Sequence, residues 1–218
     1  PSYTPSELRW QLEDARARLV FTQEPLLPTV HAATTLPVGL VGPDGDLGAW
    51  LDDAEPPTVS IDPASDLVAL PYSSGTTGLP KGVMLTHRNL VANLAQIQAA
   101  EAAAPSPAFL AVLPFFHIYG LVVILNLGLL RGTPVVSLPR FELEPFLAAI
   151  ERWQVALLHV VPPIVLALAR HPAVDAHDLR SVRWLFSGAA PLGAELTAQV
   201  EARLGCRVRQ GYGMTEAS

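Results

Sequence analysis

Apolar residues along the second half of the chain follow two different periods. Short runs that are mainly apolar, such as 155–161 and 182–186, are typical of buried strands, whereas 144–153 and 193–204 repeat apolar residues at helical spacing. Strands that alternate with helices in this way form parallel sheets with helices on both faces. The pattern therefore predicts an α/β fold built on mainly parallel sheets covered by helices.

The first half of the chain predicts shorter elements separated by loops. Residues 6–18 are expected to form a helix with Ser6 as its N-cap, and 19–22 and 38–41 are expected to form short strands. The rest of 25–63 is rich in Pro, Gly and Asp, which favours loops.

The central region predicts strands and helices that flank polar segments. Apolar runs at 67–70 and 83–85 predict two strands, and a helix is expected over 86–102. A strand at 109–113 would deliver His117 at its end. The largely apolar run 120–130 predicts a wholly buried helix, and Pro145 is expected to occupy the first position of a later helix.

The segment between the two central strands carries the most distinctive chemistry of the chain. It reads Ser73-Ser74-Gly75-Thr76-Thr77-Gly78-Leu79-Pro80-Lys81-Gly82. Small residues let backbone N–H groups approach an anion closely, hydroxyl groups add donors, and Lys81 supplies a positive charge. This combination predicts a binding loop for phosphate groups.

Two other interpretations of this loop fit less well. A flexible linker rarely contains Pro-Lys-Gly between two strand-like runs. A P-loop would carry its second glycine where Pro80 stands, and Lys81 would lead directly into a helix. Here Lys81 leads into Gly82 and an apolar run. A helix dipole is therefore not expected to be the main attraction for the phosphates.

Composition and charge narrow the classes of function. Half of the 218 residues are apolar, which is enough for a sizeable core, and 14 Lys and Arg against 20 Asp and Glu give a formal net charge of −6. Without a basic patch we expect no nucleic-acid partner. The run 120–130 is too short to span a bilayer and 155–168 is interrupted by two prolines, so we expect no membrane span.

Cysteine usage and the start of the chain bear on location. Cys206 is the only cysteine, which excludes an intrachain disulfide and favours a core position for this side chain. The first residues show no basic segment followed by an apolar one, so no signal peptide is expected. We therefore expect a cytoplasmic protein.

Four motifs in fixed order resemble the adenylate-forming superfamily, which includes acyl-CoA synthetases, 4-coumarate–CoA ligases, beetle luciferases and peptide-synthetase adenylation domains. The first motif is the loop 73–82. The other three are Leu113-Pro114-Phe115-Phe116-His117-Ile118-Tyr119-Gly120, Ser187-Gly188-Ala189-Ala190-Pro191-Leu192 and Gln210-Gly211-Tyr212-Gly213-Met214-Thr215-Glu216. The residues of these motifs are most similar to those of the 4-coumarate–CoA ligases.

This resemblance implies an acid–thiol ligase, an ATP-dependent carboxylate–CoA ligase. A carboxylic acid attacks the α-phosphate of ATP to give acyl-AMP and pyrophosphate, and coenzyme A then displaces AMP to give a thioester. The implied small molecules are ATP, Mg²⁺, coenzyme A and the acid. Because a carboxylate is already a nucleophile, the first step needs positioning and charge stabilisation more than a general base.

The resemblance also implies the residues around the nucleotide. Tyr212 is similar to the residue that stacks on adenine, Thr215 to one that contacts the α-phosphate, and Glu216 to a magnesium ligand that Ser73 assists. The expected nucleotide-binding set is Ser73, Ser74, Gly75, Thr76, Thr77, Gly78, Lys81, Gly188, Ala189, Ala190, Gln210, Gly211, Tyr212, Gly213 and Thr215. The expected catalytic set is His117, Lys81, Thr215 and Glu216.

The acyl group and coenzyme A have their own implied contacts. His117 matches the histidine beside the reacting carboxylate, and Tyr119 matches a tyrosine that admits an aromatic acid. The expected acyl-binding set is His117, Tyr119, Gly188, Ala189 and Gly213. Arg140 stands where the family places a basic residue near the coenzyme A nucleotide, although an ordinary surface charge explains it equally well.

The resemblance covers the whole chain but only a middle portion of the family's length. Residues 1–218 are thus expected to be a partial AMP-binding N-terminal domain, without an N-terminal segment and a C-terminal domain that carries a catalytic lysine. Within it, 25–63 would connect two parts of the same domain. We expect this portion to turn over poorly alone and to associate through newly exposed apolar faces.

Two alternatives to a carboxylate–CoA ligase remain open at this point. The first is an amino-acid adenylation domain of the same superfamily. The second is a noncatalytic fragment that binds a nucleotide or an acyl-adenylate without reacting.

Overall fold

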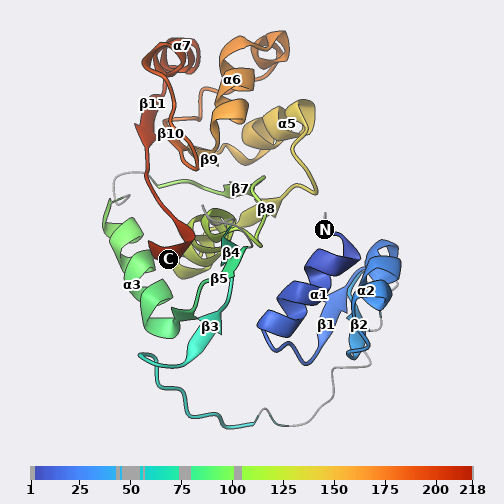
Figure 1. Cartoon of the computed structure of the whole chain (residues 1–218). Helices are drawn as coiled ribbons and strands as arrows, with labels where there is room; N and C mark the ends of the chain where they lie inside the picture. Colours follow the sequence, from blue (N-terminus) through green and yellow to red (C-terminus); the bar gives the residue numbers. More distant parts are fainter. Residues whose placement is uncertain are drawn as a thin grey trace. The chain divides into compact units, whose positions relative to one another are not determined.

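Figure 1 shows the fold in a computed structural model, which describes residues 3–42, 45, 55, 57–73, 80–100 and 105–217. The chain divides into two compact units, Pro1–Ile61 and Asp62–Ser218. Most of the predicted phosphate loop, namely Ser74, Gly75, Thr76, Thr77 and Gly78, lies outside the described residues.

The first unit contains two parallel strands and the helices beside them. Its elements are α1 (Pro5–Asp14), β1 (Val20–Thr22), the 3₁₀ turn η1 (Glu24–Leu26), α2 (Leu27–Ala33) and β2 (Val38–Leu40). Both predicted strands are confirmed. The predicted N-cap is wrong, because Thr4 caps α1 in a capping box with Glu7. The Glu7 carboxylate accepts from the Thr4 N–H at 2.7 Å, which satisfies a second backbone donor.

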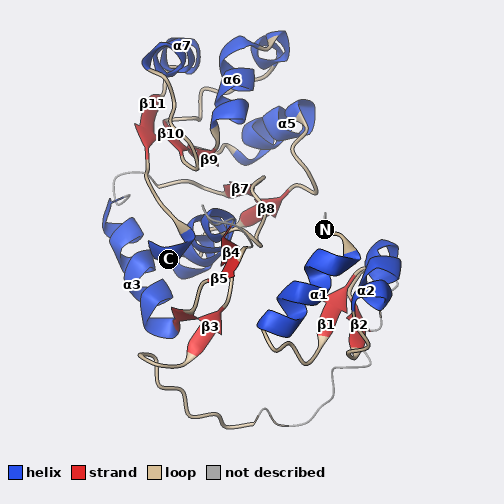
Figure 2. Ribbon diagram, in the orientation of Figure 1, coloured by secondary structure: helices blue, strands red, loops and turns tan. Residues whose placement is uncertain are grey.

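The second unit is organised by a three-stranded parallel sheet in the order β11-β10-β9 (Figure 2). Its strands are β9 (Leu157–Val160), β10 (Trp184–Ser187) and β11 (Arg207–Gln210). The register aligns Val160, Ser187 and Gln210 at the carboxyl ends of the strands. A second parallel pair, β7 (Phe109–Ala111) and β8 (Val135–Ser137), lies next to β9. The predicted mainly parallel α/β fold is confirmed.

Helices cover both faces of the three-stranded sheet. On one face, Leu158 and Leu185 are buried in a core with α5 (Leu143–Trp153), α6 (Pro162–Arg170) and α7 (Ala194–Leu204). On the other face, Leu157, Trp184 and Phe186 pack with β7 and with α3 (His87–Ala100), η3 (Tyr119–Asn126) and α4 (Leu127–Arg131). Neighbouring residues of each strand therefore enter different cores, as the pleat of a strand requires.

Two predicted helices differ from the observed ones. The run 120–130 forms the π-helical η3 and then α4, and only its first part is buried, because Leu129 and Leu130 are exposed. Helix α5 begins at Leu143, so Pro145 is its third residue and not its first. Among the described helices, none is both long and apolar enough to cross a membrane.

Two antiparallel pairs flank the predicted phosphate loop. They are β3 (Leu67–Ala69) with β6 (Leu85–Thr86), and β4 (Tyr72–Ser73) with β5 (Lys81–Gly82). The second predicted strand is therefore shifted toward β6, and Met84 is exposed. Because Ser73 pairs with Lys81, the register itself holds two predicted phosphate-binding residues opposite each other.

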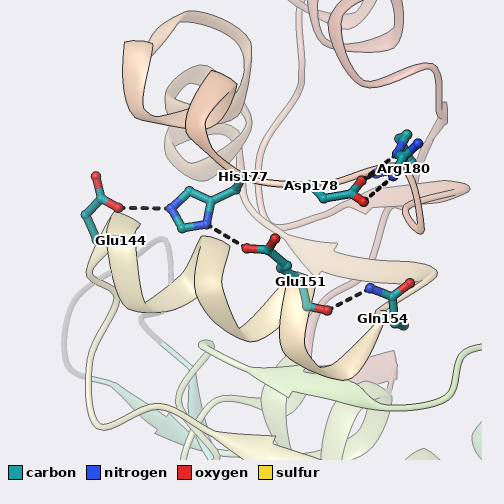
Figure 3. Close-up of polar contacts among 6 residues, drawn as sticks. All are labelled: Glu144, Glu151, Gln154, His177, Asp178 and Arg180. Atoms are coloured by element: carbon teal, nitrogen blue, oxygen red, sulfur yellow. Dashed lines mark hydrogen bonds and ion pairs between the residues drawn. The ribbon is translucent and has the colours of Figure 1, made fainter.

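His177 connects the segment after the 3₁₀ turn η4 (Pro172–Ala176) to helix α5 (Figure 3). Its Nε2 lies 3.0 Å from Glu144 Oε2, and its Nδ1 lies 3.2 Å from Glu151 Oε2. The two hydrogen bonds to these carboxylates raise the pKa of His177 above its ordinary value. Its side chain is only 16% exposed. When protonated, the ring can donate to both carboxylates and so acts as a clamp between two turns of α5 and the segment that follows η4.

The His177 clamp predicts a pH-dependent stability. A raised folded-state pKa means that its contribution is complete below about pH 6.5 and is lost as the pH rises through the folded-state pKa. Urea unfolding of wild type and His177→Gln should therefore differ most near about pH 6 and converge by about pH 9. A stability difference that stays constant or grows over this range would contradict the clamp.

Candidate functional site

A hydrogen bond between Ser73 and Glu216 joins two motifs that are far apart in the sequence. Ser73 Oγ donates to Glu216 Oε1 at 3.0 Å, although 143 positions separate the residues. Ser73 ends β4 and pairs with Lys81, whereas Glu216 lies in the 3₁₀ turn η5 (Thr215–Ala217). The fold therefore brings together a hydroxyl group, a carboxylate and a nearby lysine, which the sequence assigned to phosphates and their metal ion.

A pocket of about 310 Å³ lies beyond the carboxyl ends of β10 and β11. Parallel sheets commonly bind ligands at this edge, because the loops that leave the strands meet there. Residues from three of the four motifs, from helix α3 and from adjoining positions in η3, β10 and η5 line it. They are Asn93, Ile97, His117, Ile118, Tyr119, Val123, Phe186, Gly188, Ala189, Gly211, Tyr212, Gly213, Met214, Thr215 and Ala217.

Most predicted acyl- and nucleotide-binding residues that the structure describes line this pocket. Ser73 and Lys81 lie at the phosphate loop and not in the pocket lining, and three other predicted residues also lie outside it. Ala190 is exposed beside the pocket, and the side chain of Gln210 turns to the backbone of Leu192. Arg140 is exposed and pairs with the Glu142 carboxylate, so its implied contact with coenzyme A stays a prediction.

Sequence reasoning missed seven lining residues, namely Asn93, Ile97, Ile118, Val123, Phe186, Met214 and Ala217. Four of them belong to the quoted motifs or extend them by one residue, so the motifs themselves could have indicated these positions. Ile97 lies in the helix that was predicted over 86–102, without a role at a site. Asn93 lies one turn before Ile97, and nothing in the sequence shows that this side of α3 borders a pocket.

Tyr119 and Phe186 form one wall of the pocket. The Tyr119 hydroxyl donates to the Phe186 carbonyl oxygen at 3.1 Å, and both rings contact the ring of buried His159, with centroids at 6.2 and 5.8 Å. Burial, with a further contribution from the positive charge of Arg131, lowers the pKa of His159 to about 3. The histidine behind this wall is therefore neutral, and the wall carries no charge.

His117 enters the pocket just before the π-helix η3. Its Nδ1 accepts a hydrogen bond from the Tyr119 N–H at 3.2 Å. A neutral imidazole with an accepting Nδ1 carries its proton on Nε2, which makes Nε2 a donor. Such a donor suits a developing or existing negative charge on a ligand in the pocket.

Tyr212 presents an unusually open aromatic surface. Its side chain is 93% exposed, and its hydroxyl contacts Met214 Sδ at 3.8 Å. A large exposed aromatic ring at the edge of a pocket provides a surface on which a planar ring can stack.

The oxygen atoms of Ser73 and Glu216 fit a magnesium ion. Mg²⁺ prefers hard oxygen ligands and usually combines one or two carboxylates with phosphate oxygens and water. Within the described part of the chain, no group of three or more His, Cys, Asp or Glu side chains gathers as a metal site. The donor set therefore suits an ion that a substrate phosphate helps to hold.

The comparisons with known proteins agree with this geometry. The family described as AMP-binding enzyme matches residues 1–218 of the chain. The chain belongs to this family. 4-Coumarate–CoA ligase 2 from Oryza sativa subsp. japonica is 43% identical over 100% of the chain and 43% of its own length. 4-Coumarate–CoA ligase 2 from Petroselinum crispum is 42% identical over 100% of the chain and 42% of its own length.

Solved structures place the AMP-binding chain in the same fold. ATP-bound MatB from Rhodopseudomonas palustris superposes with a TM-score of 0.85 at 30% identity, over 99% of this chain and 44% of that one. The chain thus spans less than half the length of each of these three relatives. The expected family and α/β fold are confirmed.

Two glycines allow the aromatic wall to form. A Cβ on Gly188 would lie 2.8 Å from the Tyr119 ring, and one on Gly211 would lie 2.5 Å from the Phe186 ring, so both rings rest directly on backbone. Gly188→Ala and Gly211→Ala should therefore each lower the free energy of unfolding by ~1–3 kcal/mol. Chemical denaturation measures this effect.

Gly193→Ala is the matched control, because a Cβ there meets nothing within 4 Å and its φ of −67° suits any residue. Equal stability losses for all three variants would show that the close packing under the two rings is not the cause.

Proposed function

We propose that the chain forms the adenylate- and acyl-binding part of an ATP-dependent carboxylate–CoA ligase. The observation that carries the proposal is the Ser73–Glu216 hydrogen bond, which connects the phosphate loop to the motif that lines the pocket. A phosphate chain beside these residues would leave the α-phosphate near Thr215 and the acyl group in the pocket. The 4-coumarate–CoA ligase relatives support this assignment.

The residues of the site divide the proposed first reaction among themselves. Lys81 and the Ser73 hydroxyl hold the phosphates that leave as pyrophosphate, and Tyr212 stacks on the adenine. His117 and Thr215 lie in the pocket lining, where their donors would orient the acid and the α-phosphate for attack. The nucleophile is an oxygen of the carboxylate itself. As it bonds to the α-phosphorus, the bond from that phosphorus to the oxygen that bridges to the β-phosphate breaks, and pyrophosphate leaves.

Ser73 and Glu216 would hold Mg²⁺, which neutralises charge on the phosphates when bound. In the second reaction the thiol of coenzyme A attacks the acyl carbon and AMP departs. Arg140 is the proposed contact for the coenzyme A nucleotide. A cytoplasmic location belongs to the same proposal.

The lining of the pocket favours an acid without a second charge. Among the described residues that line it, none is Asp, Glu, Lys or Arg, and the walls include Ile97, Val123 and Phe186. A buried charge without a partner is costly, so a dicarboxylic acid or an α-ammonium group would be disfavoured. This observation favours an aryl- or medium-chain acyl ligase over an amino-acid adenylation domain.

Binding of a stable adenylate mimic tests the proposal. A sulfamoyl adenosine that carries a cinnamoyl group should bind the chain saturably in a calorimeter. Tyr212→Ala should weaken it about tenfold or more, because stacking of a base on an aromatic ring contributes ~1–3 kcal/mol. The same compound with a malonyl group in place of cinnamoyl should bind far more weakly.

Binding is the appropriate measurement because the resemblance assigns a catalytic lysine to a separate domain, so we propose that these residues turn over poorly alone. A folded chain that binds neither compound, or that binds the malonyl compound more tightly, would contradict the proposed site.

The magnesium assignment generates a separate prediction. Glu216→Gln keeps the size and the hydrogen-bond acceptor for Ser73 but removes the charge that attracts the cation. Addition of Mg²⁺ should strengthen ATP binding to wild type by about tenfold and should change it little in Glu216→Gln. Glu142→Gln, which alters an exposed carboxylate outside the pocket, is the control. An unchanged response to Mg²⁺ in Glu216→Gln would exclude Glu216 as a ligand.

A further inference from the structure

Gln210 ends β11, and its side chain holds the loop that follows β10. Its amide oxygen accepts from the Leu192 N–H at 2.8 Å, and its amide nitrogen donates to the Leu192 carbonyl oxygen at 3.2 Å. One side-chain amide therefore binds both backbone groups of one residue. We propose that Gln210 is a positioning residue, which fixes the loop 188–192 in the shape that binds the adenylate; this inference rests on the proposed function.

The loop 188–192 needs such a restraint. Gly188 and Ala189 line the pocket, whereas the side chain of Leu192 is buried in the core behind it. Between them the backbone turns sharply, and Ala189 has a φ of 69° in the left-handed region that residues other than glycine disfavour. A restraint at Leu192 offsets this preference by keeping the far end of the turn in place.

The sheet holds the near end of the same loop. The Gly188 N–H donates to the Val160 carbonyl at 3.1 Å, and the Gly211 N–H donates to the Ser187 carbonyl at 3.0 Å. Gln210 directly precedes the segment 211–213, which lines the pocket beside the loop. The Gln210 amide therefore sets the spacing between two segments that would touch the ligand.

Gln210 is expected to act through the loop and not by direct contact. Its side chain is absent from the residues that line the pocket, and both of its polar atoms already have partners at Leu192. If the Gln210 side chain served only to contact the nucleotide, its replacement would not change the hydrogen exchange of the Leu192 amide.

Two substitutions separate the two hydrogen bonds. Gln210→Met keeps the length of the side chain and removes both bonds. Gln210→Glu keeps the acceptor for the Leu192 N–H, but an ionised carboxylate cannot donate to the Leu192 carbonyl oxygen. When the introduced carboxyl group is protonated, it is both acceptor and donor and restores the pair. The loop 188–192 has no ionisable side chain. The charged groups on the adjacent β11 and α7 are Arg207, Arg209, Glu195, Glu201 and Arg203.

The probe is the cinnamoyl sulfamoyl adenosine, titrated into wild type and variants at two pH values. Gln210→Met should bind it about five- to tenfold more weakly at both pH values, as expected for the loss of two hydrogen bonds. Gln210→Glu should bind as weakly at about pH 8 and should recover to within about twofold of wild type only when the pH falls to the ordinary range of a glutamate pKa, near about pH 4. Each variant is compared with wild type at the same pH, which removes the effect of other titrating groups.

Gln199→Met is the matched control. The Gln199 amide also has both ends bound, accepting from Arg170 Nε at 3.1 Å and donating to Glu195 Oε1 at 2.9 Å, but it lies on the surface of α7. This variant should bind the probe as wild type does. Wild-type affinity in Gln210→Met, or a Gln210→Glu to wild-type ratio that does not change with pH, would overturn the proposal.

Amide exchange of the unliganded chain tests the clamp without reference to function. The Leu192 amide should exchange about tenfold faster in Gln210→Met than in wild type and should keep its protection in Gln199→Met. If wild type fails to bind the probe, the proposed function fails, and the exchange rates still decide the clamp. Equal Leu192 exchange in wild type and Gln210→Met would overturn it.

Discussion

The parallel register of β9, β10 and β11 is the constraint on which the pocket depends. It aligns Val160, Ser187 and Gln210, so that the chain leaves β10 and β11 at the same edge. The backbone pairing continues one residue further through the amides of Gly188 and Gly211. Because this edge is fixed by backbone hydrogen bonds, the loop 188–192 and the segment 211–213 meet without depending on side-chain contacts alone.

The pocket has an uncharged wall at this edge of the sheet, and the charged side chains lie at the phosphate loop. The rings of Tyr119 and Phe186 pack closely against two glycines, and both contact the ring of buried, neutral His159. This produces an uncharged wall, while the charged Glu216 and Lys81 lie with Ser73 at the phosphate loop. Separation of an apolar pocket from a charged end matches a ligand with an acyl group at one end and phosphates at the other.

Much of this arrangement is predictable from the sequence, because period and motif order report the strands, the helices and their connections. The parallel strands β9 and β10 and the residues His117, Tyr119, Tyr212 and Thr215 were located in this way. Contacts between segments that are distant in the sequence could not be predicted from periodicity or motifs. Asn93 and Phe186 carry no signal of their own, since their role depends on how α3 and β10 pack. The direction of the Gln210 side chain likewise depends on the position of Leu192 in three dimensions.

Local errors have local physical causes. The capping box of Thr4 and Glu7 satisfies two backbone donors and therefore outcompetes Ser6 as a helix start. In the run 120–130, hydrophobicity alone does not distinguish a residue that faces a core from one on the exposed end of α4, such as Leu129.

A crystal structure of the chain with the cinnamoyl sulfamoyl adenosine would test the central claim most directly. The account predicts the cinnamoyl group against Tyr119 and Phe186, the adenine on the ring of Tyr212, and the sulfamoyl group near His117 and Thr215. An adenosine bound away from Tyr212, or a cinnamoyl group outside the pocket lined by Tyr119 and Phe186, would contradict it.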